Sequence, residues 1–145
     1  MITSAAEFER LRTSEKPEEY DRAHLEEAPE EVWLEVIRDY PGMRTWVAHN
    51  RTVSVDVLRI LARDADWDVR HRVAMKRKTH RTPDLIEHFS RDVDEGIRLM
   101  MARSPNVKVE ILERLSADTD EWVRLTAEAR LRGEPAPDSD VLLKS

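Results

Sequence analysis

Apolar residues recur along this chain in short clusters with helical spacing, separated by turns rich in Asp, Pro and Ser. Four segments of one kind align: MRTWVAHN, VRHRVAMK, IRLMMARS and VRLTAEAR, which begin 26, 28 and 26 residues apart. Each begins with an apolar residue and has another four positions later, the spacing of one buried helix face. The columns are Met43, Val69, Ile97 and Val123; Val47, Val73, Met101 and Ala127; and the small residues Ala48, Ala74 and Ala102.

Segments of a second kind lie between the first: VDVLRILARD, PDLIEHFSRD and VEILERLSAD, with an earlier copy in EEVWLEVIRD. They predict a second short helix in each copy. Its apolar columns are Val57, Leu85 and Ile111; Leu58, Ile86 and Leu112; and Leu61, Phe89 and Leu115. Helices this short do not hold alone, because nucleation is costly and one narrow stripe buries little surface. We therefore expect stacked copies that share a core, which is an α-solenoid.

The turns and the two ends complete the predicted architecture. DADWDVR, DVDEGIR and DTDEWVR share a D-x-D motif, whose second Asp is suited to cap the following helix. We expect one all-α domain over residues 1–132, with a helical N-terminal cap (1–28), two-helix repeats of about 26 residues (29–132) and a polar, flexible tail (133–145). The fourth repeat has only its first helix, so its end could pair with a second copy, although we favour a monomer.

The cap is predicted to contain two helices. SAAE at residues 4–7 has the pattern of a capping box, which indicates a helix over residues 5–13. KPEEYDRAHLEEA indicates another over residues 17–27. The apolar side chains expected to pack on the first repeat are Phe8, Leu11, Tyr20 and Leu25.

Units of the form D-x-D-x-x-V-R-x-x-V-A followed by T-P-x-L-x-x-L resemble the leucine-rich repeat variant family, a group of bacterial, HEAT-like α-solenoids. DADWDVRHRVA…TPDLIEHFSRD carries the best match, and the resemblance covers about residues 29–132. It implies a right-handed superhelix, some 3₁₀ helices and a role as an interaction surface. Some members carry an iron–sulfur centre on a cysteine cluster. This chain has no Cys, so the resemblance implies no cofactor here.

Charge is distributed unevenly, and it marks the candidate site. The net charge is −6, but residues 1–42 alone hold 12 acidic and 5 basic residues. Residues 70–81, RHRVAMKRKTHR, hold six Lys or Arg, two His and no acid. The connection after Ala74 is two residues longer than its counterparts, and cations fill it. The candidate partner-binding residues lie here and in the equivalent loops: Lys76, Arg77, Lys78, His80, Arg81, His49, Arg51 and Arg103.

Each candidate has a plainer interpretation. The basic loops can be a solvated rim, since Lys and Arg usually stay in water, or a ridge that attracts an acidic partner or phosphates. The arginine column Arg44, Arg70, Arg98 and Arg124 can be an anion-binding stripe, but a structural ladder to the D-x-D turns is favoured. The four Trp do not share one repeat column, so packing is favoured over base stacking, and Trp33 is expected in the core.

Catalytic and membrane chemistry is not indicated. The five His show no metal-binding spacing, and there is no phosphate-binding Gly loop and no nucleophile elbow. We therefore expect no enzyme activity, no catalytic residues, no metal and no cofactor. No apolar run reaches the roughly 18 residues that span a bilayer, and the N-terminus lacks a signal-peptide pattern, so we expect no membrane partner and a cytoplasmic location.

The sequence thus favours a non-enzymatic protein–protein interaction or scaffold module with an unidentified, possibly acidic, protein partner. Nucleic-acid binding through the basic loop ridge is the alternative. A further alternative is an immunity or inhibitor-type partner protein, which would use the acidic N-terminal region. The exposed second-helix column Arg59, Glu87 and Glu113 is an additional candidate surface.

Overall fold

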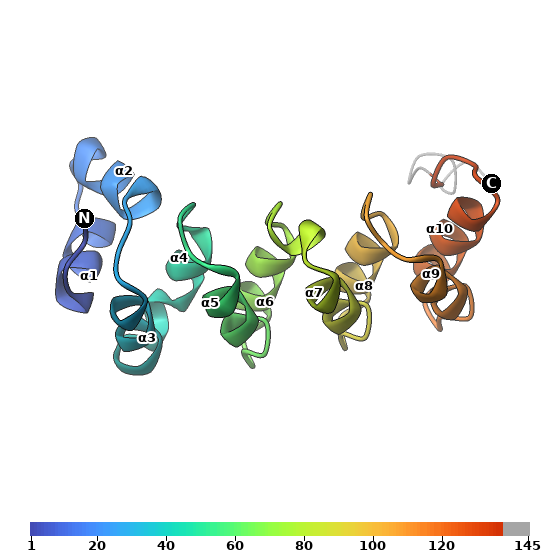
Figure 1. Cartoon of the computed structure of the whole chain (residues 1–145), viewed down its shortest axis with the longest axis horizontal. Coiled ribbons are helices and arrows are strands. Elements are labelled where there is room, and N and C mark those ends of the chain that lie inside the picture. Colours follow the sequence, from blue (N-terminus) through green and yellow to red (C-terminus); the bar gives the residue numbers. More distant parts are fainter. Residues whose placement is uncertain (138–145) are drawn as a thin grey trace. The chain divides into compact units, whose positions relative to one another are not determined.

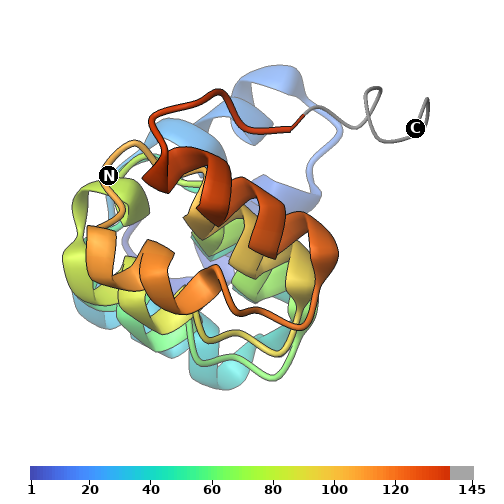
Figure 2. The same ribbon diagram turned by 90° about the vertical axis from the view of Figure 1, so that its right-hand side faces the viewer.

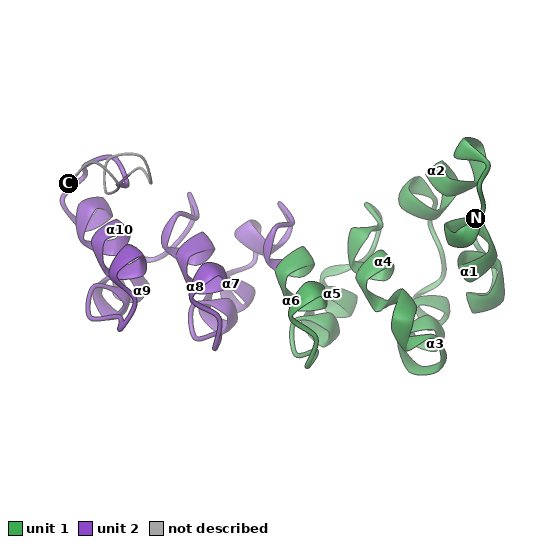
Figure 3. Cartoon of the chain, turned by 180° about the vertical axis from the view of Figure 1, so that it is seen from behind, with its two compact units in different colours: residues 1–73 green, residues 74–145 purple. Residues whose placement is uncertain are grey.

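The computed structural model describes residues 1–137, and in that range the chain is all-helical, with ten α-helices, two 3₁₀ helices and no strand. Most of the predicted flexible tail, residues 138–145, lies outside the described residues. The chain divides into two compact units, unit 1 (residues 1–73) and unit 2 (74–145), coloured separately in Figure 3. Each unit is described by itself.

Unit 1 contains the predicted cap and the first copies of the repeat (Figure 1). Its helices are α1 (Ala5–Thr13), α2 (Pro17–Leu25), α3 (Glu30–Asp39), η1 (Pro41–Met43), α4 (Arg44–His49), α5 (Val55–Leu61) and α6 (Trp67–Ala74), whose last residue falls in unit 2. Helix α1 packs on α2 and α3, and α3 packs on α4 and α5. Helix α3 is therefore the element that joins the cap to the following copies.

Unit 2 contains the later copies. Its helices are η2 (Thr79–Arg81), α7 (Pro83–Phe89), α8 (Glu95–Ala102), α9 (Val109–Leu115) and α10 (Glu121–Leu131). Helix α8 contacts both α7 and α9, and α10 lies against both α8 and α9 (Figure 2). Pro83 begins α7, where its missing N–H costs nothing because the first helical N–H groups have no intrahelical partner.

The repeated apolar columns form the cores of these units, as predicted. Every column member of α5 to α10 is at most 6% exposed. Met43 is the exception and is only half-buried. Its copy begins with Pro41 and Gly42, which form a 3₁₀ turn, so Met43 ends that turn instead of lying within a helix.

The D-x-D turns carry a repeated set of hydrogen bonds. The side chains of Asp64, Asp92 and Asp118 each accept, at 2.9 Å, from the backbone N–H two residues later. Asp94 and Asp120 then accept from the third residue of α8 and α10, at 2.9 and 3.1 Å. These N-cap bonds satisfy N–H groups that lack an intrahelical partner.

The arginine column binds the same turns, so the ladder interpretation is confirmed. Arg98 makes a two-pronged ion pair with the Asp118 carboxylate, at 2.9 and 3.0 Å. Arg44 pairs with Asp64 at 3.4 Å. The remaining two members donate to backbone carbonyls of these turns: Arg70 to Asp64 and Ala65, and Arg124 to Asp118.

The cap forms the two predicted helices, but half of its predicted packing residues are wrong. Phe8 and Leu11 are fully buried, whereas Tyr20 is 39% and Leu25 is 50% exposed. Ala23 is the buried residue of α2 instead. Tyr20 lies beside the Arg12 guanidinium, and Leu25 ends the helix, so neither side chain enters the core.

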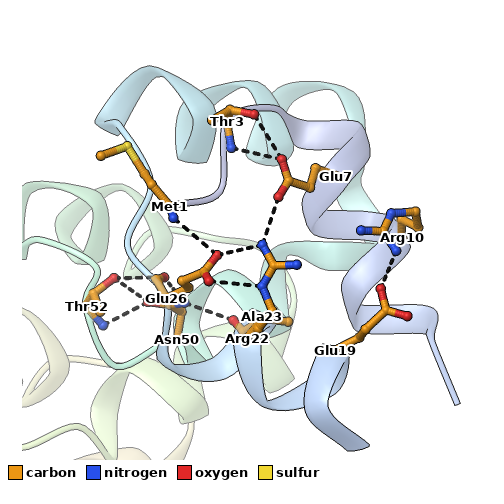
Figure 4. A network of polar contacts seen from close by, with 10 residues as sticks. All are labelled: Met1, Thr3, Glu7, Arg10, Glu19, Arg22, Ala23, Glu26, Asn50 and Thr52. Atoms are coloured by element: carbon orange, nitrogen blue, oxygen red, sulfur yellow. Dashed lines mark hydrogen bonds and ion pairs between the residues drawn. The ribbon is translucent and has the colours of Figure 1, made fainter. Parts of the chain in front are cut away.

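A polar network fixes the cap to the next copy (Figure 4). Arg22 pairs with Glu26 at 2.9 Å and with Glu7 at 3.2 Å. The fully buried Asn50 donates its amide to the carbonyls of Ala23 and Glu26, at 2.9 and 3.0 Å. The end of α2 is thereby tied to the turn that follows α4.

Candidate partner-binding site

The basic connection between α6 and α7 is an ordered turn. Thr79 N donates to the Lys76 carbonyl at 3.0 Å, Arg81 N to the Lys78 carbonyl at 3.2 Å, and the Thr82 hydroxyl to the same Lys78 carbonyl at 2.7 Å. Thr79 is fully buried. This connection is two residues longer than its counterparts, and the extra length forms part of the 3₁₀ helix η2.

His80 clamps this turn to its neighbour. Its Nε2 lies 2.8 Å from the Ala74 carbonyl oxygen, and its Nδ1 lies 2.8 Å from the Ser104 hydroxyl. A carbonyl only accepts, so Nε2 donates; in the neutral ring Nδ1 then accepts the Ser104 proton. Asn106 also donates to the His80 carbonyl, at 2.6 Å. Both ring nitrogens of this predicted binding residue therefore have structural partners.

A groove lies beside this clamp. It has a volume of about 320 Å³ and is lined by Met75, His80, Met100, Arg103, Ser104 and Pro105. Met75 is 61% exposed, although it directly follows the buried Ala74. Met75, Met100 and Pro105 give the groove an apolar surface, and methionine adapts readily to differently shaped apolar partners.

Arg103 lines this apolar surface, and further cations follow Met75 in the sequence. Arg77, Arg81 and Arg103 are exposed, and within residues 1–137 their side chains have no hydrogen bond or carboxylate partner. Lys76 and Lys78 are half-buried in the same turn. No acidic residue occurs in the sequence between Asp68 and Asp84. We call this combination the basic groove: Met75, Lys76, Arg77, Lys78, His80, Arg81, Met100, Arg103, Ser104 and Pro105.

The other two predicted residues lie in unit 1. His49 stacks on His24, with ring centroids 4.2 Å apart, and its Nδ1 is 3.0 Å from Arg72 Nη1. Arg51 is exposed, and its backbone N–H donates to the His24 carbonyl at 2.9 Å. The basic groove is built from unit 2 residues alone, so a ridge that includes His49 and Arg51 stays a prediction.

A second hollow in unit 2 includes one member of the second-helix column, Glu87. Its volume is about 530 Å³, and Pro83, Asp84, Glu87, Lys108, Glu110 and Ile111 line it. Hydrogen bonding from Arg91, outweighing burial, lowers the pKa of Glu87, and Arg114 adds to this effect. Glu87 is thus paired with two arginines of the chain, so its charge is not free to select a partner.

The tryptophans are used mainly for packing. Trp33 is buried and meets the ring of Phe8 edge-on at 5.1 Å, which confirms the predicted core position. Trp67 is exposed and stacks on His71 at 4.4 Å. No Trp, Tyr or Phe lines the basic groove.

The part of the chain that the structure describes contains no group of three or more His, Asp or Glu placed to hold a metal ion. Nor does any helix within residues 1–137 combine the length and apolar character needed to cross a membrane.

Sequence reasoning located the cations of the groove but missed its apolar surface. Met75 and Met100 lie outside the repeated apolar columns, and an apolar residue out of register with a core stripe is the signal that marks them. The comparisons with known proteins add no relative: no family model, no curated protein and no solved structure matches this chain.

Proposed function

We propose that this chain is a non-enzymatic protein-interaction module that binds an acidic protein segment in the basic groove. The observation that carries the proposal is an apolar surface lined by Arg103, in a turn region whose exposed Arg77 and Arg81 have, like Arg103, no carboxylate partner within residues 1–137. An apolar side chain of the partner would lie on Met75 and Met100, and flanking carboxylates would meet Arg77, Arg81 and Arg103. Desolvated apolar contact supplies affinity at such surfaces, while the charges select the partner.

The finer architecture is part of this proposal. The copies within residues 29–132 would form a short right-handed α-solenoid of the leucine-rich repeat variant type, acting as a monomer in a bacterial cytoplasm. Three features support it: the shared buried columns, the repeated Asp turns, and the arginines that bind those turns. Repeats of this kind display loops on one edge as an extended binding surface.

The test is a titration with a labelled peptide that carries a Leu between Glu residues. We expect binding that weakens with salt, because the rim charges are exposed to solvent. In one control peptide Lys replaces the Glu residues, and in another Ser replaces the Leu; both should bind weakly. Loss of binding on either change shows that charge and apolar contact act together.

The decisive comparison uses two charge-reversal variants with the same change in net charge. Reversal to Glu at Arg77, Arg81 and Arg103 should weaken binding by about tenfold or more, from about 0.5 kcal/mol per exposed charge pair. The matched variant carries the exchange at three other exposed arginines: Arg59, Arg63 and Arg132. Equal weakening in both variants would mean that net charge, and no groove, governs binding.

Nucleic-acid binding is the second candidate, favoured by the same exposed arginines. It requires affinity for oligonucleotides that falls steeply with salt and weakens on reversal of Arg77, Arg81 and Arg103. Among the described residues no Trp, Tyr or Phe lines the groove, and both ring nitrogens of His80 are held by structural partners, which weighs against base stacking there. A mobility-shift assay at low salt decides between the two.

An immunity or inhibitor-type role is favoured by a different surface. A hollow of about 200 Å³ in unit 1 is lined by Glu18, Asp21, Arg22, Leu25 and Glu26. Its exposed Leu25 beside carboxylates suits a basic partner. Under this alternative, a peptide with Leu between Lys residues binds, and changing Leu25 to Ser abolishes its binding.

A further inference from the structure

Unit 1 contains a cluster of cations and rings that the basic groove does not use. The Arg12 guanidinium carbon lies 3.3 Å from the ring centroid of Trp46 and 4.2 Å from that of Tyr20. The Arg72 guanidinium carbon lies 5.5 Å from the same Trp46 centroid. We call Arg12, Tyr20, Trp46 and Arg72, with the stacked His24 and His49, the arginine–aromatic cluster.

The two arginines of this cluster lack a counter-charge. Among residues 1–137, no carboxylate lies within ion-pair distance of Arg12 or Arg72, whereas Arg10, Arg22 and Arg44 of the same unit all have one. Acidic residues are nevertheless abundant around Arg12 in sequence, since residues 1–42 hold 12. Two guanidinium groups thus lie near one indole ring without a neutralising carboxylate from residues 1–137.

Hydrogen-bond capacity is also unused in the cluster. Arg12 Nε is buried without a hydrogen-bond partner, and so is His24 Nδ1. A buried donor without a partner costs free energy, and native proteins leave few of them. An oxyanion is the kind of group that satisfies guanidinium donors and offsets their charge at once.

The His49 ring does not supply an anion or a further cation in this geometry. Arg72 Nη1 lies 3.0 Å from His49 Nδ1, and a guanidinium can only donate. Nδ1 therefore accepts, and the ring is neutral with its proton on Nε2. The two arginines contribute two positive charges to the cluster.

We propose that the arginine–aromatic cluster is a binding site for a phosphate group, free or as a monoester. A phosphate carries close to two negative charges and three acceptor oxygens, which matches two guanidinium groups better than a singly charged carboxylate. The rings hold the Arg12 fork in place through cation–π contact, so little side-chain freedom is lost on binding. The site lies in unit 1 and does not rest on the proposed function of unit 2.

The test is a titration of the full chain with inorganic phosphate, followed by the NMR signal of the Trp46 indole N–H. Sodium chloride keeps the ionic strength constant, so that general screening does not change. Glycerol phosphate replaces inorganic phosphate in a second arm, and acetate replaces it in a third. The Trp46 signal should shift and saturate with the phosphates, and shift far less with acetate; the tighter of the two phosphates identifies the natural source.

The variants are Arg12→Gln, Arg72→Gln and, as a matched exposed arginine of unit 1, Arg63→Gln. The first two should each weaken phosphate binding by about tenfold or more, and Arg63→Gln should leave it unchanged. Arg72→Gln keeps the test decisive if Arg12→Gln disturbs folding, because Arg72 is farther from the ring. No saturable shift of the Trp46 signal, equal binding of acetate, or equal weakening in Arg63→Gln would each overturn the proposal.

Discussion

The turn after α4 in unit 1 and the turn after α6 in unit 2 occupy equivalent places in the repeat, but different residues hold them. Each turn follows the first helix of a copy and has to be held in one conformation before the next helix begins. In unit 1, buried Asn50 donates to the carbonyls of Ala23 and Glu26. In unit 2, His80 bonds to Ala74 and Ser104. One buried or half-buried side chain thus holds each turn. The longer unit 2 turn has further positions at which cations can be exposed.

The residues that hold the turns differ from those proposed to bind a partner. Asn50 and His80 have their hydrogen bonds inside the protein, so we expect large effects on stability from changing them. Arg77, Arg81 and Arg103 point into solvent without carboxylate partners within residues 1–137, so changing them should affect binding and leave stability nearly unchanged.

The largest effect is expected from Asn50→Ala. It leaves the Ala23 and Glu26 carbonyls without this donor in a site with no exposed surface, which should lower the free energy of unfolding by about 3 kcal/mol. Urea denaturation followed by circular dichroism measures it. Asn106→Ala is the control, because Asn106 is exposed and its single bond to the His80 carbonyl should cost less than about 1 kcal/mol. Equal losses in the two variants would refute the anchor role of Asn50.

His80→Ala should lower the free energy of unfolding by about 2 kcal/mol, less than Asn50→Ala, because the two hydrogen bonds of the half-buried ring are lost. The same denaturation experiment on His71→Ala provides the comparison, because His71 stacks on the exposed Trp67. If His71→Ala proves as costly as His80→Ala, the turn of unit 2 is not held in the way described.

The ion pair between Arg98 and Asp118 should make the stability of the protein depend on acidic pH. Burial opposes ionisation of Asp118, but hydrogen bonds from Arg98 and from the Asp120 backbone outweigh it and lower its pKa below the ordinary 3.8. A depressed folded-state pKa means that the stabilisation is complete above about pH 4 and is lost as the pH falls through the lowered value. Asp118→Asn should lower the free energy of unfolding by about 1 kcal/mol at neutral pH. The variant should then lose less stability than the natural protein as the pH falls.

The control for that pair is Asp64→Asn. Arg44 meets Asp64 at a single contact of 3.4 Å, whereas Arg98 makes two bonds to Asp118. The free energy of unfolding at neutral pH should fall less for Asp64→Asn than for Asp118→Asn, as urea denaturation measures it. A pH dependence left intact by Asp118→Asn would show that other carboxylates govern the acid loss.

The all-helical class, the helices and the buried columns could be predicted from the sequence, and so could the cations of the candidate site. The helices and buried columns followed from periodicity, because each copy repeats the same local pattern and only Met43 departs from it. Tyr20 and Leu25 were misplaced because the cap lies outside the repeat and offered no column to align. The partners of His80 and Arg12 were missed because they lie 24 to 34 residues away, at Ser104 and Trp46, and no local pattern encodes such contacts.

The basic groove is proposed to bind an acidic segment on the surface formed by its methionines. The most direct measurement is the NMR spectrum of methionine labelled at its ε-methyl carbon, recorded while the Leu-and-Glu peptide is added. We predict that the Met75 and Met100 signals shift and saturate together, while that of Met101, which is fully buried one residue further on, stays in place. Binding of the peptide with the Met75 and Met100 signals unmoved would contradict the account.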